Sequence, residues 1–234
     1  GMNIFNVALI TRAFLFFAYP TKMSGDQVWV STGNVLGIGG NSPQTIDAFS
    51  GATPLGQVAV AEKGSELAIT NIVGQPSSVW DAIVGLIPGS IGETSIIAIA
   101  LGAALLLFTG VASWKIMLSV FAGGALTGFL FNTIGPDTPI AHLPWWYHLI
   151  LGGFAFGAVF MATDPVTASR TETGKWIYGF LIGVMAIIIR VLNPGYPEGM
   201  MLAILLMNVF APLIDYYVVQ ANIKRREKRV TIKN

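Results

Sequence analysis

One short run of the chain carries residues that could hold a covalent group. The run from Asp47 to Thr53 reads DAFSGAT, and Pro54 follows it at once. Its small residues leave the backbone open to a bulky group. Because Pro is favoured at the first helical position, Thr53 is expected to be the N-cap of a short helix, whose free N–H groups suit a phosphate. On spacing alone, a plain Thr-Pro helix cap explains the same run.

Two carboxylates fall within or beside long apolar segments, where a charge is costly and usually pairs or lines a polar path. Asp164 precedes the helix-breaking Pro165, and Asp215 lies near the inner end of the last apolar stretch. Carboxylate oxygens are hard ligands, which small hard cations prefer. A cation path and a structural cap or salt bridge are therefore both open for each acid.

The remaining groups with possible chemistry favour structural roles. Arg190 could pair with an acid or a phosphate, and structural pairing is the preferred interpretation. His142 and His148 lack the spacing of metal ligands and are expected at the surface or in packing. The chain has no Cys, which excludes disulfides, zinc ribbons and Cys-ligated iron–sulfur clusters within it. A redox group carried here would be organic.

The composition is that of a membrane protein. Only 11% of the 234 residues are charged, against roughly 25% in soluble chains, while 53% are hydrophobic and 27 are Gly. A net charge of +1 leaves no field for attracting polyanions, so a nucleic-acid partner is excluded along with disorder and coiled coil. The expected fold is all-α, a polytopic membrane helix bundle in contact with lipid.

About five stretches are long and apolar enough to cross a hydrocarbon core as helices. Short connectors rich in Pro, Gly and Asn join them, so residues 94–219 are expected to form one bundle. The stretches are Thr94–Ser113, Lys115–Ile134, Trp145–Thr163, Lys175–Leu192 and Gly199–Val219.

The distribution of basic residues predicts sidedness in a bacterial inner membrane. Basic connectors alternate with connectors that lack Lys and Arg, and the tail, 220–234, holds six basic residues. By the positive-inside rule the tail is cytoplasmic, which places 20–93, with Thr53, in a structured periplasmic loop. Residues 1–19 are expected to form a half-helix or re-entrant segment. Gly1 before Met2 is typical of a cloning scar, so the sequence is expected to start inside a larger protein.

The run DAFSGAT resembles the flavinylation motif Asp-x-x-Ser-Gly-Ala-Thr of the Na+-translocating NADH:quinone oxidoreductases and the related Rnf complexes. The resemblance extends along nearly the whole chain and is more typical of the B subunit of the sodium pump than of the D subunit of Rnf. Its further segments are RAFLFFAYP at 12–20, IPGSIGE at 87–93, LGGFAFG at 151–157, MATDPV at 161–166 and NPGYPEGMM at 193–201.

This resemblance implies a respiratory sodium-pump subunit that relays electrons from NADH towards quinone, coupled to Na+ export. It implies FMN held on Thr53 through a phosphoester bond, and a riboflavin shared with the family's N-terminal half. Implied partners are the other membrane and flavin or iron–sulfur subunits, a flavin transferase, quinone and Na+. The isolated chain is expected to be inactive. The implied motif residues are Asp47, Ser50, Gly51 and Ala52 around Thr53, and the implied sodium-uptake acids are Asp164 and Asp215.

Two alternatives stay open beside the sodium-pump hypothesis. The first is the D subunit of an Rnf-type ferredoxin:NAD+ oxidoreductase, which shares the flavin motif. The second is a solute channel or transporter without a cofactor, which five spans and broken helices would also serve. The family's quinone-binding glycines lie in its N-terminal half, so no residue of this sequence is assigned to quinone.

Overall fold

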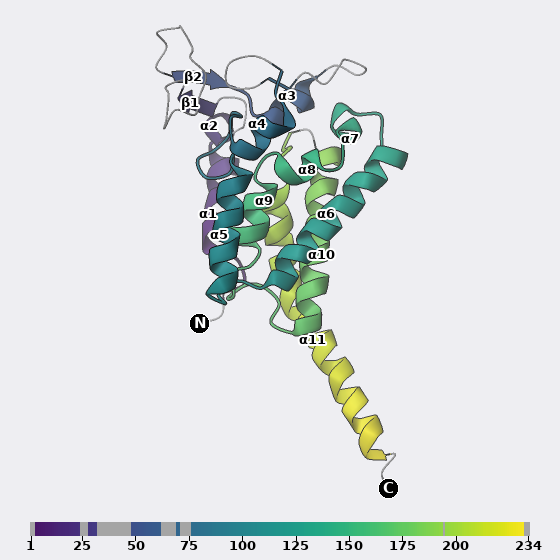
Figure 1. Cartoon of the computed structure of the whole chain (residues 1–234). Helices are drawn as coiled ribbons and strands as arrows, with labels where there is room; N and C mark the ends of the chain where they lie inside the picture. The colour runs from purple at the N-terminus through teal and green to yellow at the C-terminus, as the bar shows by residue number, and fades with distance from the viewer. Residues whose placement is uncertain are drawn as a thin grey trace.

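The computed structural model describes residues 3–23, 28–31, 48–61, 69–70, 76–193 and 195–231. Its described part is a helical bundle with one small two-stranded sheet. Three helices are long and apolar enough to cross a membrane, namely α6 (Trp114–Ile134), α10 (Glu172–Leu192) and α11 (Met200–Thr231). Two shorter apolar helices, α1 (Val7–Ala18) and α5 (Ile96–Phe108), lie alongside them (Figure 1). The prediction of an all-α membrane bundle is confirmed.

The expected span Trp145–Thr163 is not one continuous helix. The structure divides it into α8 (Tyr147–Ile150), α9 (Phe154–Phe156) and a π-helical turn η1 (Gly157–Met161). The break falls at Leu151, which is extended, and at Gly152, whose φ of 65° is a left-handed conformation suited to glycine. Apolar length alone does not reveal such a break, so the prediction of a continuous third span is corrected.

Helices α6 and α10 pack in parallel with their backbones close together. A Cβ added at Gly179 would lie 2.7 Å from the Ile116 carbonyl oxygen, and one at Gly183 would lie 2.6 Å from the Gly124 nitrogen. Small residues therefore allow these two helices to approach each other closely. Such residues are common between membrane helices, because apolar side chains gain nothing by moving from lipid into the protein. Since both helices run the same way, their N-termini lie at one end of the bundle.

The other end of the bundle carries the short elements around Thr53 (Figure 1). Strands β1 (Val28–Ser31) and β2 (Ala48–Gly51) pair antiparallel, with Val28 opposite Gly51. Helix α3 (Pro54–Val60) follows β2 directly. The remaining short helices at this end are α2 (Pro20–Met23), α4 (Val79–Val84) and α7 (Pro139–His142).

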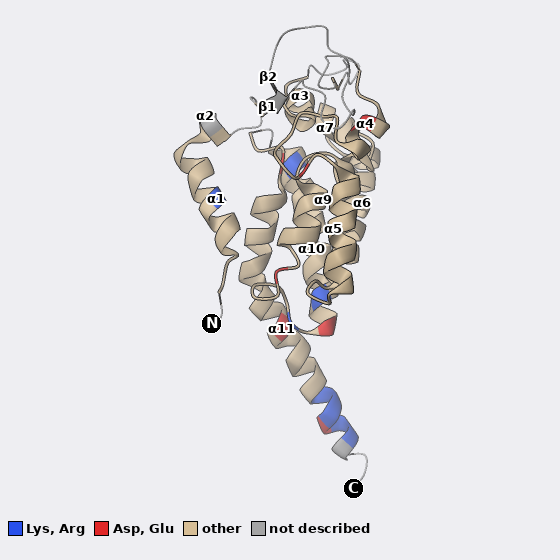
Figure 2. Cartoon of the chain, turned by 60° about the vertical axis from the view of Figure 1, so that its left-hand side comes forward, with Lys and Arg blue, Asp and Glu red and all other residues tan. Residues whose placement is uncertain are grey.

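Helix α11 begins near these short elements and continues beyond the bundle at the opposite end (Figure 1). Its last part carries a concentration of basic residues (Figure 2). Helix α3 and the basic tail are thus at opposite ends of the chain's long axis, as the sequence-based sidedness requires. The 12-residue length of α1 agrees with the expected half-helix, while its re-entrant character stays a prediction.

Candidate functional site

Thr53 forms the N-cap of α3, as the sequence predicts. Its Oγ1 accepts a hydrogen bond from the Gly56 N–H at 3.2 Å, and Pro54 is the first helical residue. The carbonyl oxygen of Ala52 accepts from the Gln57 side-chain amide at 2.9 Å. Because strand β2 ends at Gly51, Thr53 follows the sheet by only two residues. Two separate elements therefore hold its backbone.

The rest of the motif is only partly described. The backbone of Ser50 lies in β2, opposite Trp29 of β1, and Gly51 and Ala52 are half-buried. Asp47 lies outside the described residues. The structure therefore describes the backbone of the motif as far as Thr53, and it does not test the expected role of Asp47.

Thr53 is 4% exposed and lines a cavity of about 200 Å³, which we call the Thr53 cavity. The cavity joins parts of the chain that are far apart in sequence: α1, the segment before α5, and the turn between α10 and α11. We define it by Arg12, Phe16, Thr53, Glu93, Tyr196 and Glu198. Phe16 and Tyr196 form one wall, with ring centroids 4.8 Å apart in an edge-to-face arrangement.

Two carboxylates and one cation give the Thr53 cavity its charge. Glu93 Oε1 accepts from the Ser90 backbone N–H at 2.9 Å, and Glu198 Oε2 accepts from the Gly153 N–H at 2.9 Å. Burial raises the pKa of Glu93 above its ordinary value of 4.5, and the negative charge of Glu198 raises it further. Arg12 has the opposite, smaller effect on that pKa. A group bound in the cavity would therefore meet two acids and one guanidinium.

Burial also raises the pKa of Tyr196, to about 12. Its phenol therefore stays neutral over the physiological range and can donate a hydrogen bond.

Arg190 lies fully buried behind this cavity and makes hydrogen bonds to backbone carbonyl oxygens. Nη1 donates to His148 at 2.7 Å and Nε donates to Pro197 at 3.0 Å. Nη2 makes longer bonds, to Leu151 at 3.4 Å and Glu198 at 3.3 Å. The guanidinium thus ties the break between α8 and α9 to the turn before α11. The structural interpretation of Arg190 is favoured, although its partners are carbonyls and not a side-chain acid.

The expected sodium acids lie near the other end of the bundle, away from the Thr53 cavity. Asp164 accepts hydrogen bonds from the Asn6 side chain at 3.2 Å, the Val166 N–H at 3.1 Å and the Thr167 hydroxyl at 2.8 Å. The bond from Asn6 joins the start of α1 to the connector before α10. The three donors leave Asp164 with one of the roughly four acceptor positions of a carboxylate.

Asp215 accepts four hydrogen bonds from the connector before α10. Its partners are the Ser169 hydroxyl at 2.6 Å, the Arg170 N–H at 2.8 Å, and the N–H and hydroxyl of Thr171 at 3.0 and 2.6 Å. Three of these donors contact Oδ1 and one contacts Oδ2, so both carboxylate oxygens are engaged. The Asp215 carboxylate therefore anchors the start of α10 to α11, which is the structural interpretation left open by the sequence.

The described residues contain no group of three His, Asp or Glu placed to hold a metal ion. His142 is exposed, with Nε2 3.0 Å from Asp137 Oδ1. His148 is fully buried, and neither ring nitrogen has a hydrogen-bond partner within the described part of the chain. The two histidines are a surface residue and a packing residue, as expected.

Comparison with known proteins gives a family match that covers residues 1–224, described as the NQR2, RnfD, RnfE family. The chain belongs to this family. Among individual relatives, it is 56% identical over 230 residues to the B subunit of the Na(+)-translocating NADH-quinone reductase of Yersinia pestis. It is 55% identical to the protein of that name in Chromohalobacter salexigens and 52% identical to that in Pseudomonas aeruginosa.

These alignments cover 98% of this chain and 51–52% of each relative. The chain therefore spans about half the length of the family members that it matches. Sequence reasoning anticipated Thr53 but assigned no role to Arg12, Glu93 or Glu198. Each lies in a segment that resembles the family, at 12–20, 87–93 or 193–201, and this resemblance could have indicated a functional role for these residues.

Proposed function

We propose that this chain forms part of the membrane-embedded B subunit of a Na+-translocating NADH:quinone oxidoreductase. In this proposal it carries FMN on Thr53 through a phosphoester bond and relays electrons from NADH towards quinone, coupled to Na+ export. The observation that carries the proposal is the position of Thr53 in a cavity that Arg12 also lines. The relatives of this chain are named as B subunits of the reductase. FMN bound there would supply the electron-carrying chemistry.

Three residues of the Thr53 cavity suit parts of such a group, whereas the carboxylates of Glu93 and Glu198, when ionised, would repel its phosphate. Arg12 supplies positive charge for the phosphate, as a guanidinium suits phosphate oxygens. Phe16 and Tyr196 supply aromatic surface, which suits a planar ring. The N-cap hydrogen bond fixes the Thr53 side chain at the start of α3, and small residues precede Thr53 in the sequence. A sheet, a helix, the buried Glu93 and the half-buried Glu198 thus surround the proposed point of attachment.

The chain offers a matched control for the attachment, because Thr138 also caps a helix that begins with Pro. Its side chain accepts from the Ala141 N–H, as Thr53 accepts from the Gly56 N–H. After co-expression with a flavin transferase, intact-mass measurement should show one FMN adduct on wild type and on Thr138→Val. Thr53→Val should show none, and Asp47→Ala should show less than wild type. An adduct that persists on Thr53→Val rules out the assignment.

We further propose that Thr53 faces the periplasm and the basic tail faces the cytoplasm of a bacterial inner membrane. Because the chain has no Cys, single cysteines report without background. An impermeant maleimide should label Ile91→Cys, at a fully exposed position, in intact cells, and should label Arg226→Cys only after lysis. The reverse labelling pattern would invert the orientation and remove access of a periplasmic transferase to Thr53.

The sodium path is proposed to include Asp164 and Asp215. Asp164 accepts three hydrogen bonds and Asp215 four, which favours Asp164 as the more direct contact, since fewer donors compete with Na+ there. In the assembled complex, at equal flavin content, Asp164→Asn should raise the sodium concentration for half-maximal quinone reduction more than Asp215→Asn does. Asp215→Asn should lower complex yield more. Unchanged sodium dependence in both variants would leave both acids as structural anchors.

The alternatives differ in what can be observed. The D subunit of Rnf shares the family, whereas the relatives above are named as B subunits of the reductase, which favours the sodium pump. A cofactor-free channel or transporter would show no flavin fluorescence in a denaturing gel. The proposal also includes partners: the other membrane and flavin or iron–sulfur subunits, the flavin transferase, quinone, Na+ and lipid. Without them the isolated chain is expected to be inactive.

A further inference from the structure

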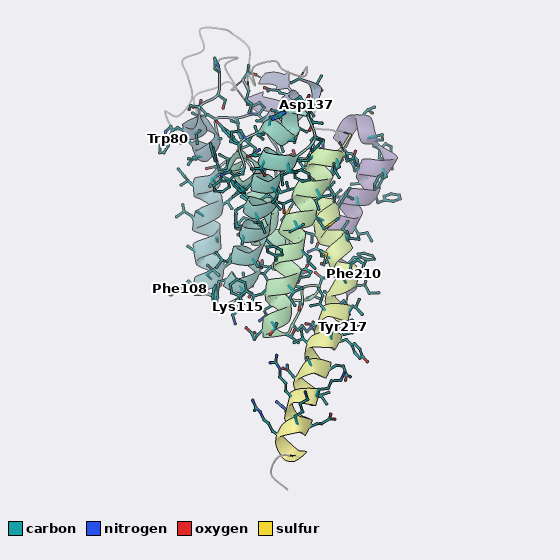
Figure 3. All side chains as sticks on the ribbon, turned by 90° about the vertical axis from the view of Figure 1, so that its right-hand side faces the viewer. Trp80, Phe108, Lys115, Asp137, Phe210 and Tyr217 are labelled. Carbon is teal, nitrogen blue, oxygen red and sulfur yellow. The ribbon has the colours of Figure 1, made fainter. Side chains whose placement is uncertain are left out.

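A second and larger cavity lies at the end of the bundle opposite to Thr53. It has a volume of about 450 Å³ and lies between the turn from α5 to α6 and the connector that leads to α10. We call it the basic cavity and define it by Trp114, Lys115, Arg170, Glu172 and Lys175. Figure 3 shows Lys115 at the same end of the bundle as Phe108, with Asp137 at the other end. The basic cavity is separate from the Thr53 cavity.

The charged side chains of the basic cavity have a net charge of +2, from three cations and one anion. Glu172 contacts both lysines, at 2.5 Å from Lys115 Nζ and 2.6 Å from Lys175 Nζ. Arg170 is exposed, and its guanidinium makes no ion pair within the described part of the chain. Asp215 lies beside the connector, but its oxygens are already engaged by that connector's own donors. An anion in the cavity would meet uncompensated positive charge.

The ends of two long helices add to this charge. Helices α6 and α10 both begin at the cavity, at Trp114 and Glu172, and the N-terminus of a helix carries a partial positive charge. The N-cap of α6 is Ser113, whose side chain makes no capping hydrogen bond. The first N–H groups of this 21-residue helix are therefore without that usual acceptor.

The cavity also lies at the level where a span begins. Trp114 and Trp176 pack edge to face with centroids 5.6 Å apart, and tryptophan favours the layer of lipid headgroups. The exposed apolar side chains of Leu105, Leu107 and Phe108 on α5 approach the same end and offer a surface for acyl chains. A lipid whose phosphate lies in the basic cavity could thus place its acyl chains beside the bundle.

We propose that the basic cavity binds the phosphodiester headgroup of an anionic phospholipid, with Arg170, Lys115 and Lys175 contacting the phosphate. Free phosphate shares this chemistry but lacks the apolar part, and the lipid is favoured by the tryptophan pair and the apolar face of α5. Topology alone asks only for basic residues in this connector. It requires neither a cavity nor a pair of helix N-termini directed at it.

The experiment is a titration of the protein, purified in neutral detergent, with phosphatidylglycerol or phosphatidylcholine, followed by native mass spectrometry. Wild type should retain phosphatidylglycerol in preference to phosphatidylcholine. Arg170→Gln should weaken retention by about fivefold, the change for roughly 1 kcal/mol per basic residue. Arg226→Gln removes the same charge from the exposed tail, outside the cavity, and should leave retention unchanged.

Glu172→Gln separates a lipid site from a structural salt bridge. Loss of this anion should strengthen retention of phosphatidylglycerol several-fold, an outcome that misfolding cannot produce. Equal retention of the two lipids, or equal weakening by Arg170→Gln and Arg226→Gln, would overturn the proposal. Displacement of the lipid by millimolar inorganic phosphate would also overturn it, because the site would then bind soluble phosphate. The test does not depend on flavin, so it stands apart from the function proposed for Thr53.

Discussion

Replacing Arg190 by Met should destabilise the bundle strongly, because the guanidinium connects the break between α8 and α9 to the turn before α11. Its two short hydrogen bonds, at 2.7 and 3.0 Å, are each worth about 1.5–3 kcal/mol as bonds to a charged donor. The two longer bonds add little. Met removes the cost of burying a cation, which offsets part of the loss, but leaves the carbonyls of His148 and Pro197 without this donor. We expect a net loss of about 3 kcal/mol.

For a chain of this size, that loss corresponds to a decrease in Tm of about 6–12 °C. Fluorescence-detected size-exclusion chromatography after heating, in neutral detergent, measures it. Arg226→Met is the matched control: the side chain is exposed on the tail of α11, so Tm should change by less than about 2 °C. If Arg190→Met and Arg226→Met have the same Tm, the contacts of Arg190 with the carbonyls do not stabilise the break between α8 and α9, and this reasoning fails.

Further predictions concern pH dependence and helix packing. The raised pKa of Glu93 means that the folded protein binds a proton there more tightly than the unfolded chain, so this group adds stability as pH falls through its raised pKa towards the ordinary value of 4.5. Glu93→Gln should therefore raise Tm at about pH 8, and the difference from wild type should shrink by about pH 5; a constant difference contradicts the assignment. Gly183→Ala should cost about 1–3 kcal/mol, because its methyl meets the backbone of α6, and Gly195→Ala, at an exposed turn, should cost less than about 0.5 kcal/mol. Equal melting curves for the two alanine variants would show that α6 and α10 can separate without cost.

Local patterns in the sequence were enough for several features of the fold. The membrane bundle follows from apolar composition, and the three long spans follow from their length, since a helix satisfies its own backbone in lipid. The cap at Thr53 followed from a Thr-Pro pair, because N-cap preference depends on neighbours in the chain. Each of these properties is determined within about twenty residues.

The features that sequence reasoning missed all depend on contacts between distant segments. The Thr53 cavity brings together Arg12, Glu93 and Glu198 from three parts of the chain, and nothing in their local spacing indicates that they meet. The span 145–163 is broken because Gly152 adopts a left-handed φ and because Arg190, far along the chain, supplies donors to the carbonyls at the break. An apolar stretch fits a continuous helix equally well until that partner is present.

The two expected sodium acids show the same division. From the sequence, Asp164 and Asp215 were equivalent, each a carboxylate near the end of an apolar stretch. In the folded chain Asp164 accepts three hydrogen bonds and Asp215 four, because only Asp215 faces the turn that starts α10. The sequence by itself determined that both charges need partners, since an unpaired carboxylate is too costly in this setting. Tertiary structure decided how many donors each one has, because those donors come from segments up to 158 positions away.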